Sequence, residues 1–272
     1  MITARTLDLG GRKVELIEAG NGAPLLYLHG FADVHATGPA LLPFHDALAA
    51  RARLIAPAHP GVGNSDELAD GPGIGDMVFH YLELIDALGL DTVDLVGHGP
   101  GGWIAAEIAV LIPERVRRLA LIGATGLFVP GAHIADIFMH AQADRGFDFT
   151  SLRHMLFASA ETAPALACVP DLRGPIDLEL RRYQMLRFSS LIGFKPPYLY
   201  NRALRGRLHR ARMPAVVIAG EHDHFVPRAI AQAYADDLAG AKGRVALIAG
   251  AGHSAPLEQP AATAAKVLEG LA

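Results

Sequence analysis

The sequence contains a single cysteine, Cys168, among its 272 residues. One thiol excludes an intramolecular disulfide framework and fits a reducing compartment. We interpret Cys168 as a small buried side chain, because no activating partner stands beside it in the sequence. The spacings HExxH and CxxC are also absent, so the sequence predicts no metal site.

Charge is scarce as well: charged residues make up 19% of the chain, and the net charge is −4. This balance argues against nucleic acid or an anionic membrane surface as a partner. Residues 1–10 lack the apolar core of a secretory signal. The most apolar long stretch, residues 119–139, is interrupted by glycine, proline, histidine and aspartate, which is not typical of a membrane span. We therefore expect a cytoplasmic protein.

Apolar residues are plentiful, at 51% of the chain, which is enough for the core of one large α/β domain. Short apolar runs alternate with helical patterns, and this alternation predicts a wound α/β sheet. The predicted strands are residues 6–9, 13–18, 24–28, 53–56, 93–96, 119–122, 215–219 and 245–248. The predicted helices between them are residues 77–88, 102–112, 228–238 and 260–271.

One region breaks the alternation. Residues 127–213 contain no convincing buried strand, and their patterns indicate helical fragments instead. We interpret this region as an inserted helical cap, and residues 1–126 and 214–272 as the core that it interrupts. The predicted fragments are residues 133–143, 151–158, 178–191 and 200–209.

Gly99 is the most informative residue of the chain. The run Leu-Val-Gly-His-Gly-Pro-Gly-Gly at residues 95–102 has the frame of a G-x-S-x-G nucleophile elbow, with glycine where serine should stand. In such a turn the residue after the nucleophile donates its backbone N–H to an oxyanion. Here that residue is Pro100, which has no N–H. Two parts of an acyl-transfer site are therefore missing side by side.

An acid and a histidine follow in the order that completes this frame. Asp223 lies in the run Gly-Glu-His-Asp-His-Phe-Val-Pro, directly after a predicted strand. His253 lies in a glycine-rich loop after the last predicted strand. An acid on such a loop can orient a histidine and stabilise its protonated form. The order of elbow, acid and histidine is the one expected for an α/β-hydrolase.

The sequence resembles the α/β-hydrolase superfamily along nearly its whole length. The resemblance rests on His29-Gly30-Phe31, the run PAHPGVGNSD at residues 57–66, the elbow, Asp223 and His253. It is similar in particular to capped bacterial members such as the meta-cleavage-product hydrolases and small esterases. The resemblance implies a mostly parallel, eight-stranded sheet flanked by helices, with the helical cap inserted.

The resemblance also implies roles for individual residues. Asp223 matches the acid of the family's triad and His253 its general base, while the backbone N–H of Phe31 matches an oxyanion donor. Gly99 occupies the position of the nucleophile, and Pro100 that of the second oxyanion donor. Gly30 and His98 are further candidates for the oxyanion hole or for substrate binding. We expect His29 and His59 to fix loops and Trp103 to fill the core, and His35 and His140 are candidate pocket residues.

Three functions remain open at this point. The first is an enzyme that acts on a small or medium apolar carbonyl compound, with Asp223 and His253 as a general-base dyad and no serine. The second is a serine hydrolase inactivated by an engineered serine-to-glycine change at Gly99. The third is a non-catalytic ligand-binding protein. No motif indicates an organic cofactor, and the only partners expected are the small molecule and, in a homodimer, a second copy; a monomer is equally compatible.

Overall fold

The computed structural model describes residues 2–33, 42–69, 72–140, 149–171, 176–193 and 198–271. Its strands are β1 (Thr3–Leu9), β2 (Arg12–Ala19), β3 (Pro24–Leu28), β4 (Arg53–Pro57), β5 (Val93–His98), β6 (Val116–Ile122), β7 (Ala215–Gly220) and β8 (Val245–Ile248). They form one sheet in the order β1-β2-β4-β3-β5-β6-β7-β8. β2 is antiparallel to both of its neighbours, and the remaining pairs are parallel. The predicted fold class is confirmed.

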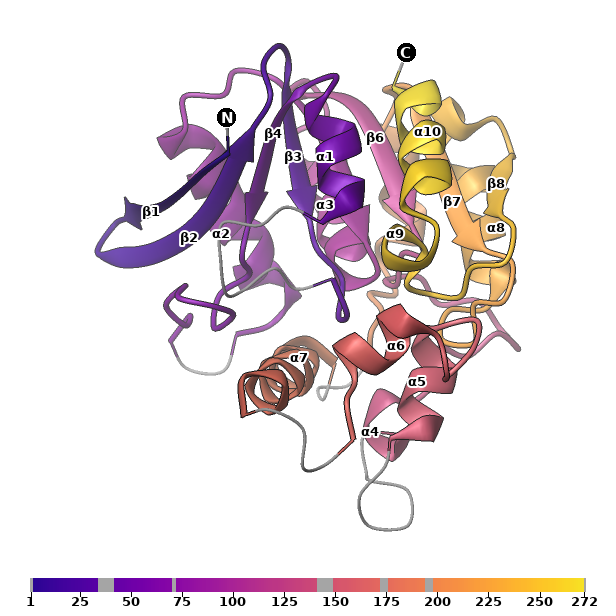
Figure 1. The fold of residues 1–272 in the computed structure, drawn as a ribbon. Coiled ribbons are helices and arrows are strands. Elements are labelled where there is room, and N and C mark those ends of the chain that lie inside the picture. The colour runs from indigo at the N-terminus through magenta and orange to yellow at the C-terminus, as the bar shows by residue number, and fades with distance from the viewer. Residues whose placement is uncertain are drawn as a thin grey trace.

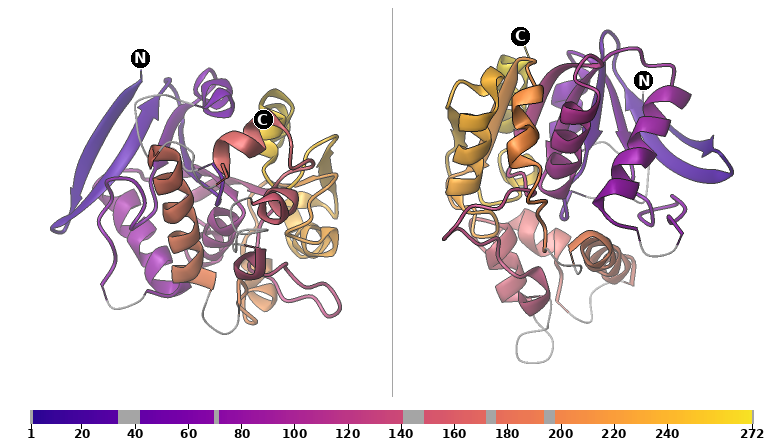
Figure 2. Two further views of the ribbon diagram at one scale, coloured as in Figure 1. Left: turned by 60° about the horizontal axis from the view of Figure 1, so that its bottom comes forward. Right: turned by 180° about the vertical axis from the view of Figure 1, so that it is seen from behind.

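Helices cover both faces of the sheet (Figure 2). The helices of the sheet layers are α1 (Pro43–Ala49), α2 (Ile74–Ala87), α3 (Pro100–Leu111), α8 (Arg228–Asp237), α9 (Ala255–Glu258) and α10 (Pro260–Gly270), with a short 3-10 helix at Ala239–Ala241. α1 and α10 pack on one face, and α2, α3 and α8 on the other. Two covered faces explain why the strands read as continuous apolar runs rather than alternating ones.

β3 shows how the two faces are supplied from one strand. Leu25 and Tyr27 pack with Phe44 of α1, whereas Leu26 and Leu28 belong to the core on the opposite face. Successive side chains of a strand point to opposite sides, so a run without polar residues fills both cores. β3 is therefore held by packing on both faces of the sheet, and the loop that follows it starts from a fixed position.

The segment between β6 and β7 is helical. It contains α4 (Ile137–His140), α5 (Thr150–Leu156), α6 (Ala163–Cys168), α7 (Ile176–Gly193) and a 3-10 helix at Arg205–Arg210. In Figure 1 these α-helices lie together beyond the end of the sheet towards which the parallel strands point. This is the end where the loops after β3, β5, β7 and β8 emerge.

Several local predictions differ from the structure. The predicted helix at residues 200–209 is replaced by the 3-10 helix that begins only at Arg205, because the Asn201 side chain accepts a hydrogen bond from the Ala203 N–H and favours a turn there. α1, α6 and α9 were not predicted. Cys168 at the end of α6 is half-buried against the core rather than fully buried. His35 lies outside the described residues.

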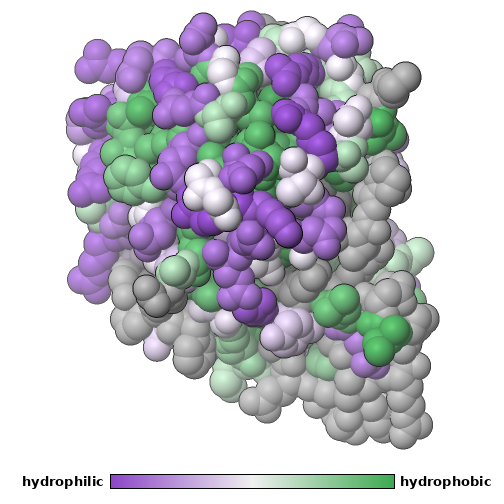
Figure 3. Space-filling model, turned by 90° about the vertical axis from the view of Figure 1, so that its left-hand side faces the viewer, coloured by the Kyte–Doolittle hydropathy of each residue, from purple (hydrophilic) through white to green (hydrophobic). Residues whose placement is uncertain are grey.

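β1 forms one edge of the sheet and is mostly exposed. Its Arg5 pairs with Glu18 of β2 at 2.5 Å, and the face on this side of the molecule mixes hydrophilic and hydrophobic residues (Figure 3). Charged side chains on an edge strand oppose pairing with another sheet. In the described part of the chain, no helix combines the length and the apolar character needed to cross a membrane.

Candidate functional site

The turn at Gly99 joins β5 to α3 and has an unusual backbone. Gly99 has φ 53° and ψ −117°, a conformation that glycine adopts without a Cβ clash. Its N–H donates to the Ile122 carbonyl oxygen at 2.8 Å, and its own carbonyl accepts from Trp103 N–H. A Cβ at Gly101 would stand 2.2 Å from the Leu28 carbonyl oxygen, so the start of α3 lies directly against β3. The glycines of the frame therefore allow a sharp turn close to the sheet.

Pro100 is the first residue of α3. Proline is favoured at this position, because its fixed φ suits a helix and its missing N–H has no partner inside the helix. The same property removes a donor from the surface of the turn. The sequence thus gains a well-formed helix start at the point where an oxyanion donor is absent.

Asp223 and His253 form a buried pair at the carboxyl ends of β7 and β8. The His253 Nδ1–H donates to Asp223 Oδ2 at 2.9 Å, and the two side chains are 1% and 4% exposed. The other oxygen of Asp223 accepts the N–H groups of Phe225 and Val226 at 2.9 and 2.8 Å. With its acid fixed by these backbone bonds, the imidazole is held in one orientation and one tautomer.

The other ring nitrogen of His253 faces Gly99. Nε2 is buried, and no hydrogen-bond partner for it exists among the described residues. A Cβ at Gly99 would lie 3.0 Å from Nε2 and 3.9 Å from the Gly30 Cα. The ring therefore comes closer to the backbone of the turn than a side chain at position 99 would comfortably allow. A buried ring nitrogen without a partner is costly, which marks Nε2 as the reactive point of the pair.

The surroundings of this nitrogen are aromatic. The Phe225 ring meets the His253 ring edge to face, with centroids 4.8 Å apart. Phe31 lies 5.6 Å from Phe225, and Phe188 of α7 lies 6.0 Å from Phe31. Phe188 also stacks on His59 at 4.4 Å. The site is thus bounded by apolar surface, which strengthens electrostatic interactions within it.

The loop after β3 lies beside the turn at Gly99. The Gly30 N–H donates to Asp33 Oδ1 at 2.7 Å, which fixes the backbone that leads into Phe31. Among the described residues, none accepts a hydrogen bond from the Phe31 N–H. Phe31 itself is fully buried. The loop therefore places an available backbone donor next to the region that Gly99 and His253 enclose.

His98 lies beneath the turn, with both of its ring nitrogens hydrogen-bonded. Nδ1 contacts Asp33 Oδ1 at 2.9 Å, and Nε2 contacts the main-chain oxygen of His253 at 2.8 Å. Burial alone lowers the pKa of His98, but the adjacent Asp33 carboxylate more than offsets it and leaves the pKa raised. Burial likewise raises the pKa of Asp33, yet contact with His98 holds it far below its usual range. His98 thus has no ring nitrogen free for a ligand.

The remaining predicted residues occupy loops and core. His29 and His59 bond each other's backbone: the His59 N–H donates to His29 Nε2 at 3.1 Å, and His59 Nε2 donates to the His29 carbonyl oxygen at 2.9 Å. They fix neighbouring loops, as predicted. Trp103 is buried and donates to Glu107, which confirms its core role.

The loop that carries His253 is tied to the segment between β6 and β7. Glu258 accepts the N–H groups of Ala158 and Gly252, each at 2.8 Å. The Ser254 N–H donates to the carbonyl oxygen of Leu156, at the end of α5. Burial raises the pKa of Glu258. Two short connections therefore hold the histidine loop against the helical segment.

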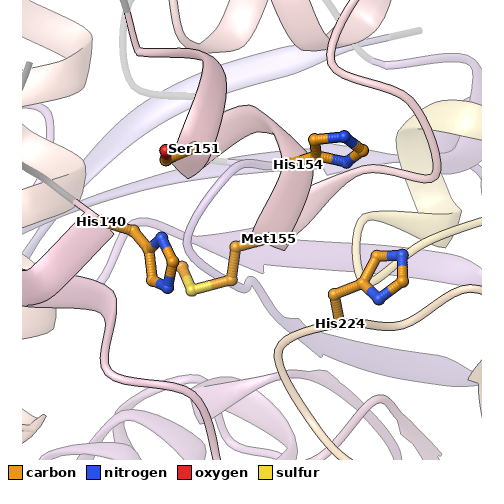
Figure 4. A pocket seen from close by; sticks show the side chains of 5 residues that line it. All are labelled: His140, Ser151, His154, Met155 and His224. Atoms are coloured by element: carbon orange, nitrogen blue, oxygen red, sulfur yellow. The ribbon is translucent and has the colours of Figure 1, made fainter. Parts of the chain in front are cut away.

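A hollow of about 370 Å³ lies between α5 and the loop that follows β7 (Figure 4). Its lining residues are His140, Ser151, His154, Met155 and His224. The rings of His154 and His224 are 6.2 Å apart at nearly right angles. Within the described ranges, no group of three or more His, Cys, Asp or Glu side chains is arranged to hold a metal ion. The structure thus places His140 in the lining of a hollow, together with His224 of the loop that carries Asp223.

Sequence reasoning missed Asp33, Phe188 and Glu258. Asp33 follows His29-Gly30-Phe31 closely, so an acid three residues after the glycine was an available signal. Phe188 had none, because its place over the site depends on how α7 packs.

Comparisons with known proteins agree with this fold. Residues 25–266 match the family described as "Alpha/beta hydrolase family". Over 127 residues the chain is 36% identical to a 2-hydroxymuconate semialdehyde hydrolase of Pseudomonas putida, a match that covers 46% of this chain and 45% of that protein. Over 269 residues it is 29% identical to the polyketide synthase ThaQ of Burkholderia thailandensis, covering 93% of this chain but 12% of that protein. These matches thus span less than half the length of either relative.

Solved structures share the fold at low sequence identity. A 2-hydroxy-6-oxo-6-phenylhexa-2,4-dienoate hydrolase from Rhodococcus sp. superimposes with a TM-score of 0.73 and 20% identity, covering 100% of this chain and 99% of that one. A putative lipase from Acinetobacter baumannii gives a TM-score of 0.77 at 18% identity, with 99% and 91% covered. At such identities the likeness concerns the fold alone.

Proposed function

The chain belongs to the alpha/beta hydrolase family, and from this premise we propose that it cleaves a small or medium apolar carbonyl compound without a serine nucleophile. The bond cleaved is the acyl C–O bond of an ester or a lactone, or the C–C bond next to a carbonyl group. His253 is the general base of this reaction, and Asp223 orients it. The Phe31 N–H is the donor to the developing oxyanion.

One observation carries the proposal: His253 Nε2 is buried, lacks a partner among the described residues, and faces a position where no side chain stands. In the proposed step Nε2 takes a proton from a water molecule on the open side of Gly99. The water oxygen bonds to the carbonyl carbon, the bond between that carbon and the leaving group breaks, and the proton held by Nε2 passes to the leaving group. A positioned base contributes about a hundred- to ten-thousandfold in rate, which supports slow but specific turnover.

The substrate class follows from the walls of the site. Phe31, Phe188 and Phe225 offer apolar surface around His253. In this proposal residues 127–213 act as a cap, with α7 supplying Phe188. The relatives carry names of a semialdehyde hydrolase and a polyketide synthase, and both names describe chemistry of carbonyl compounds. An apolar carbonyl compound fits both the walls and these relatives.

The substitution Gly99→Ser tests the proposal. The new Cβ would stand 3.0 Å from His253 Nε2, so its hydroxymethyl group takes the room of the attacking water, and we expect turnover to fall about tenfold or more. Turnover is measured by mass spectrometry on a panel of aryl esters, lactones and vinylogous diketones.

A matched control separates this effect from backbone strain. Gly131 also has a positive φ, 79°, but nothing lies within 4 Å of a Cβ there, so Gly131→Ser should leave turnover unchanged. A large rise in turnover with Gly99→Ser would instead reveal an ordinary serine hydrolase that has lost its nucleophile. Sequencing the native coding DNA then distinguishes an engineered glycine from a natural one.

A non-catalytic binding protein is the second candidate, and the pair of adjacent losses at Gly99 and Pro100 favours it. Such a protein would bind an apolar carbonyl compound in the same site and release it unchanged. Tight binding without product, insensitive to His253→Ala, would support this candidate and exclude the enzyme.

A further inference from the structure

A second imidazole–carboxylate pair lies beneath the turn at Gly99. His98 Nδ1 and Asp33 Oδ1 are 2.9 Å apart, and neither side chain is exposed. Asp33 also accepts the Gly30 N–H at 2.7 Å and the hydroxyl of Tyr27. Burying a charged pair is costly unless its remaining hydrogen-bonding groups are satisfied. Here the protein satisfies them with groups from β3 and from the loop that follows it.

This pair connects the two loops that flank Gly99. On one side Asp33 holds the Gly30 N–H, and on the other His98 Nε2 donates to the His253 carbonyl oxygen at 2.8 Å. The chain of bonds spans residues that are 65 and 155 positions apart in the sequence. Moving either loop therefore disturbs the other through His98.

We propose that Asp33 and His98 are positioning residues that set the place and the proton affinity of the base at His253. Through Gly30 the same pair fixes the loop of the Phe31 donor. The roles of His253 and Phe31 rest on the proposed function, but the coupling between His98 and His253 can be measured without it.

The charge of His98 acts on His253 across a short distance. The two ring centroids are 4.9 Å apart, and Asp33 keeps the pKa of His98 raised despite burial. When the His98 ring carries a proton, its charge disfavours a second proton on a ring at this distance. The titratable groups that face His98 are Asp33, Asp223 and His253, and Asp33 in turn meets Tyr27 and His29.

Two substitutions separate the two bonds of His98. His98→Asn puts an amide where Nδ1 stood, so it can still bond Asp33 but cannot reach the His253 carbonyl oxygen. His98→Gln puts its amide where Nε2 stood, so it keeps the bond to His253 and loses the one to Asp33. Both variants replace an imidazole that can carry a proton with a neutral amide.

The readout is the NMR titration of the His253 ring in the full-length, histidine-labelled protein, assigned with His253→Gln. We expect its midpoint to rise by about one pH unit in both variants, because a neighbouring positive charge is lost. We also expect kcat to fall about tenfold in His98→Asn with KM retained, and to fall less in His98→Gln. His80→Gln, at a buried histidine of α2, is the control and should leave the His253 midpoint unchanged.

An unchanged His253 midpoint in folded His98 variants would overturn the inference. If these variants do not fold, Asp33→Asn takes their place: it keeps one oxygen acceptor and loses the negative charge, and we expect it to lower the His98 midpoint and reduce kcat at constant KM. No change in either quantity would again overturn the inference. A midpoint shift in a protein that turns over no substrate would refute the proposed function and support the coupling of His98 to His253.

Discussion

Within the described ranges, two buried imidazole–carboxylate pairs share the same contact distance of 2.9 Å. They differ at the second ring nitrogen. His98 Nε2 is bonded to a main-chain oxygen, whereas His253 Nε2 has no partner in the described part of the chain. The residue types alone do not separate the two pairs. The partner of the second ring nitrogen distinguishes them. The His98 pair holds the backbone in place, whereas the His253 pair keeps one nitrogen available to a reactant.

The largest effect is expected from a substitution that removes the imidazole of the Asp223–His253 pair. His253→Gln keeps a polar side chain of similar size but cannot take up a proton, and we expect kcat/KM to fall about a thousandfold. The comparison variant is His222→Gln, on the same loop as Asp223 but half exposed, which should retain full turnover. Full activity of His253→Gln in a steady-state assay would remove the distinction between the two pairs.

A buried histidine without a carboxylate sharpens the comparison. Burial and the nearby Arg12 lower the pKa of His80 from 6.5 to about 4. Between these values the unfolded chain binds the proton and the folded chain does not, so stability falls as pH drops from 6.5 towards 4. We expect this residue to cost about 3 kcal/mol of unfolding free energy at about pH 4.

Urea denaturation between about pH 7 and pH 4 measures this loss, and His80→Leu should flatten the profile. His98 has the opposite sign, because its raised pKa adds stability that is complete below 6.5 and is lost as pH rises through the folded value. An unaltered profile in His80→Leu would mean that other groups set the acid sensitivity.

The smallest expected effect concerns the missing donor. Pro100→Ala restores an N–H at the start of α3, and we expect kcat to rise about tenfold, less than the effect of a fully optimised donor. Removal of the rigid ring should cost about 0.5 kcal/mol of stability. Pro43→Ala, at the start of α1, carries the same stability loss without a gain in turnover. An equal kcat in wild type and Pro100→Ala would show that this N–H does not reach the oxyanion.

Much of the fold was predictable because the physical signals were local. The apolar runs mark strands buried on both faces. α2 has a clear apolar periodicity, whereas α3 is buried on nearly all sides and was predictable from the elbow before it and Pro113 after it. The short helices α1, α6 and α9 escaped prediction, since four to seven residues carry too little periodic pattern. The 3-10 helix at Arg205–Arg210 was misjudged as the end of a longer helix for a similar reason.

The site residues show the same difference between local sequence signals and contacts made by packing. Asp223, His253 and Gly99 stand in recognisable loops, and the structure brings their loops together. The partnership of His98 with Asp33 and the place of Phe188 arise only from packing between distant segments. No pattern within a single stretch of sequence encodes such contacts.

Glu258 gives the architecture a consequence for how such a protein changes over time. One carboxylate clasps the chain after α5 and the turn before His253 simultaneously. A substitution that moves the chain after α5 therefore also moves the turn before His253. Substitutions in the helical segment are therefore tolerated most easily where they leave both hydrogen bonds of Glu258 intact.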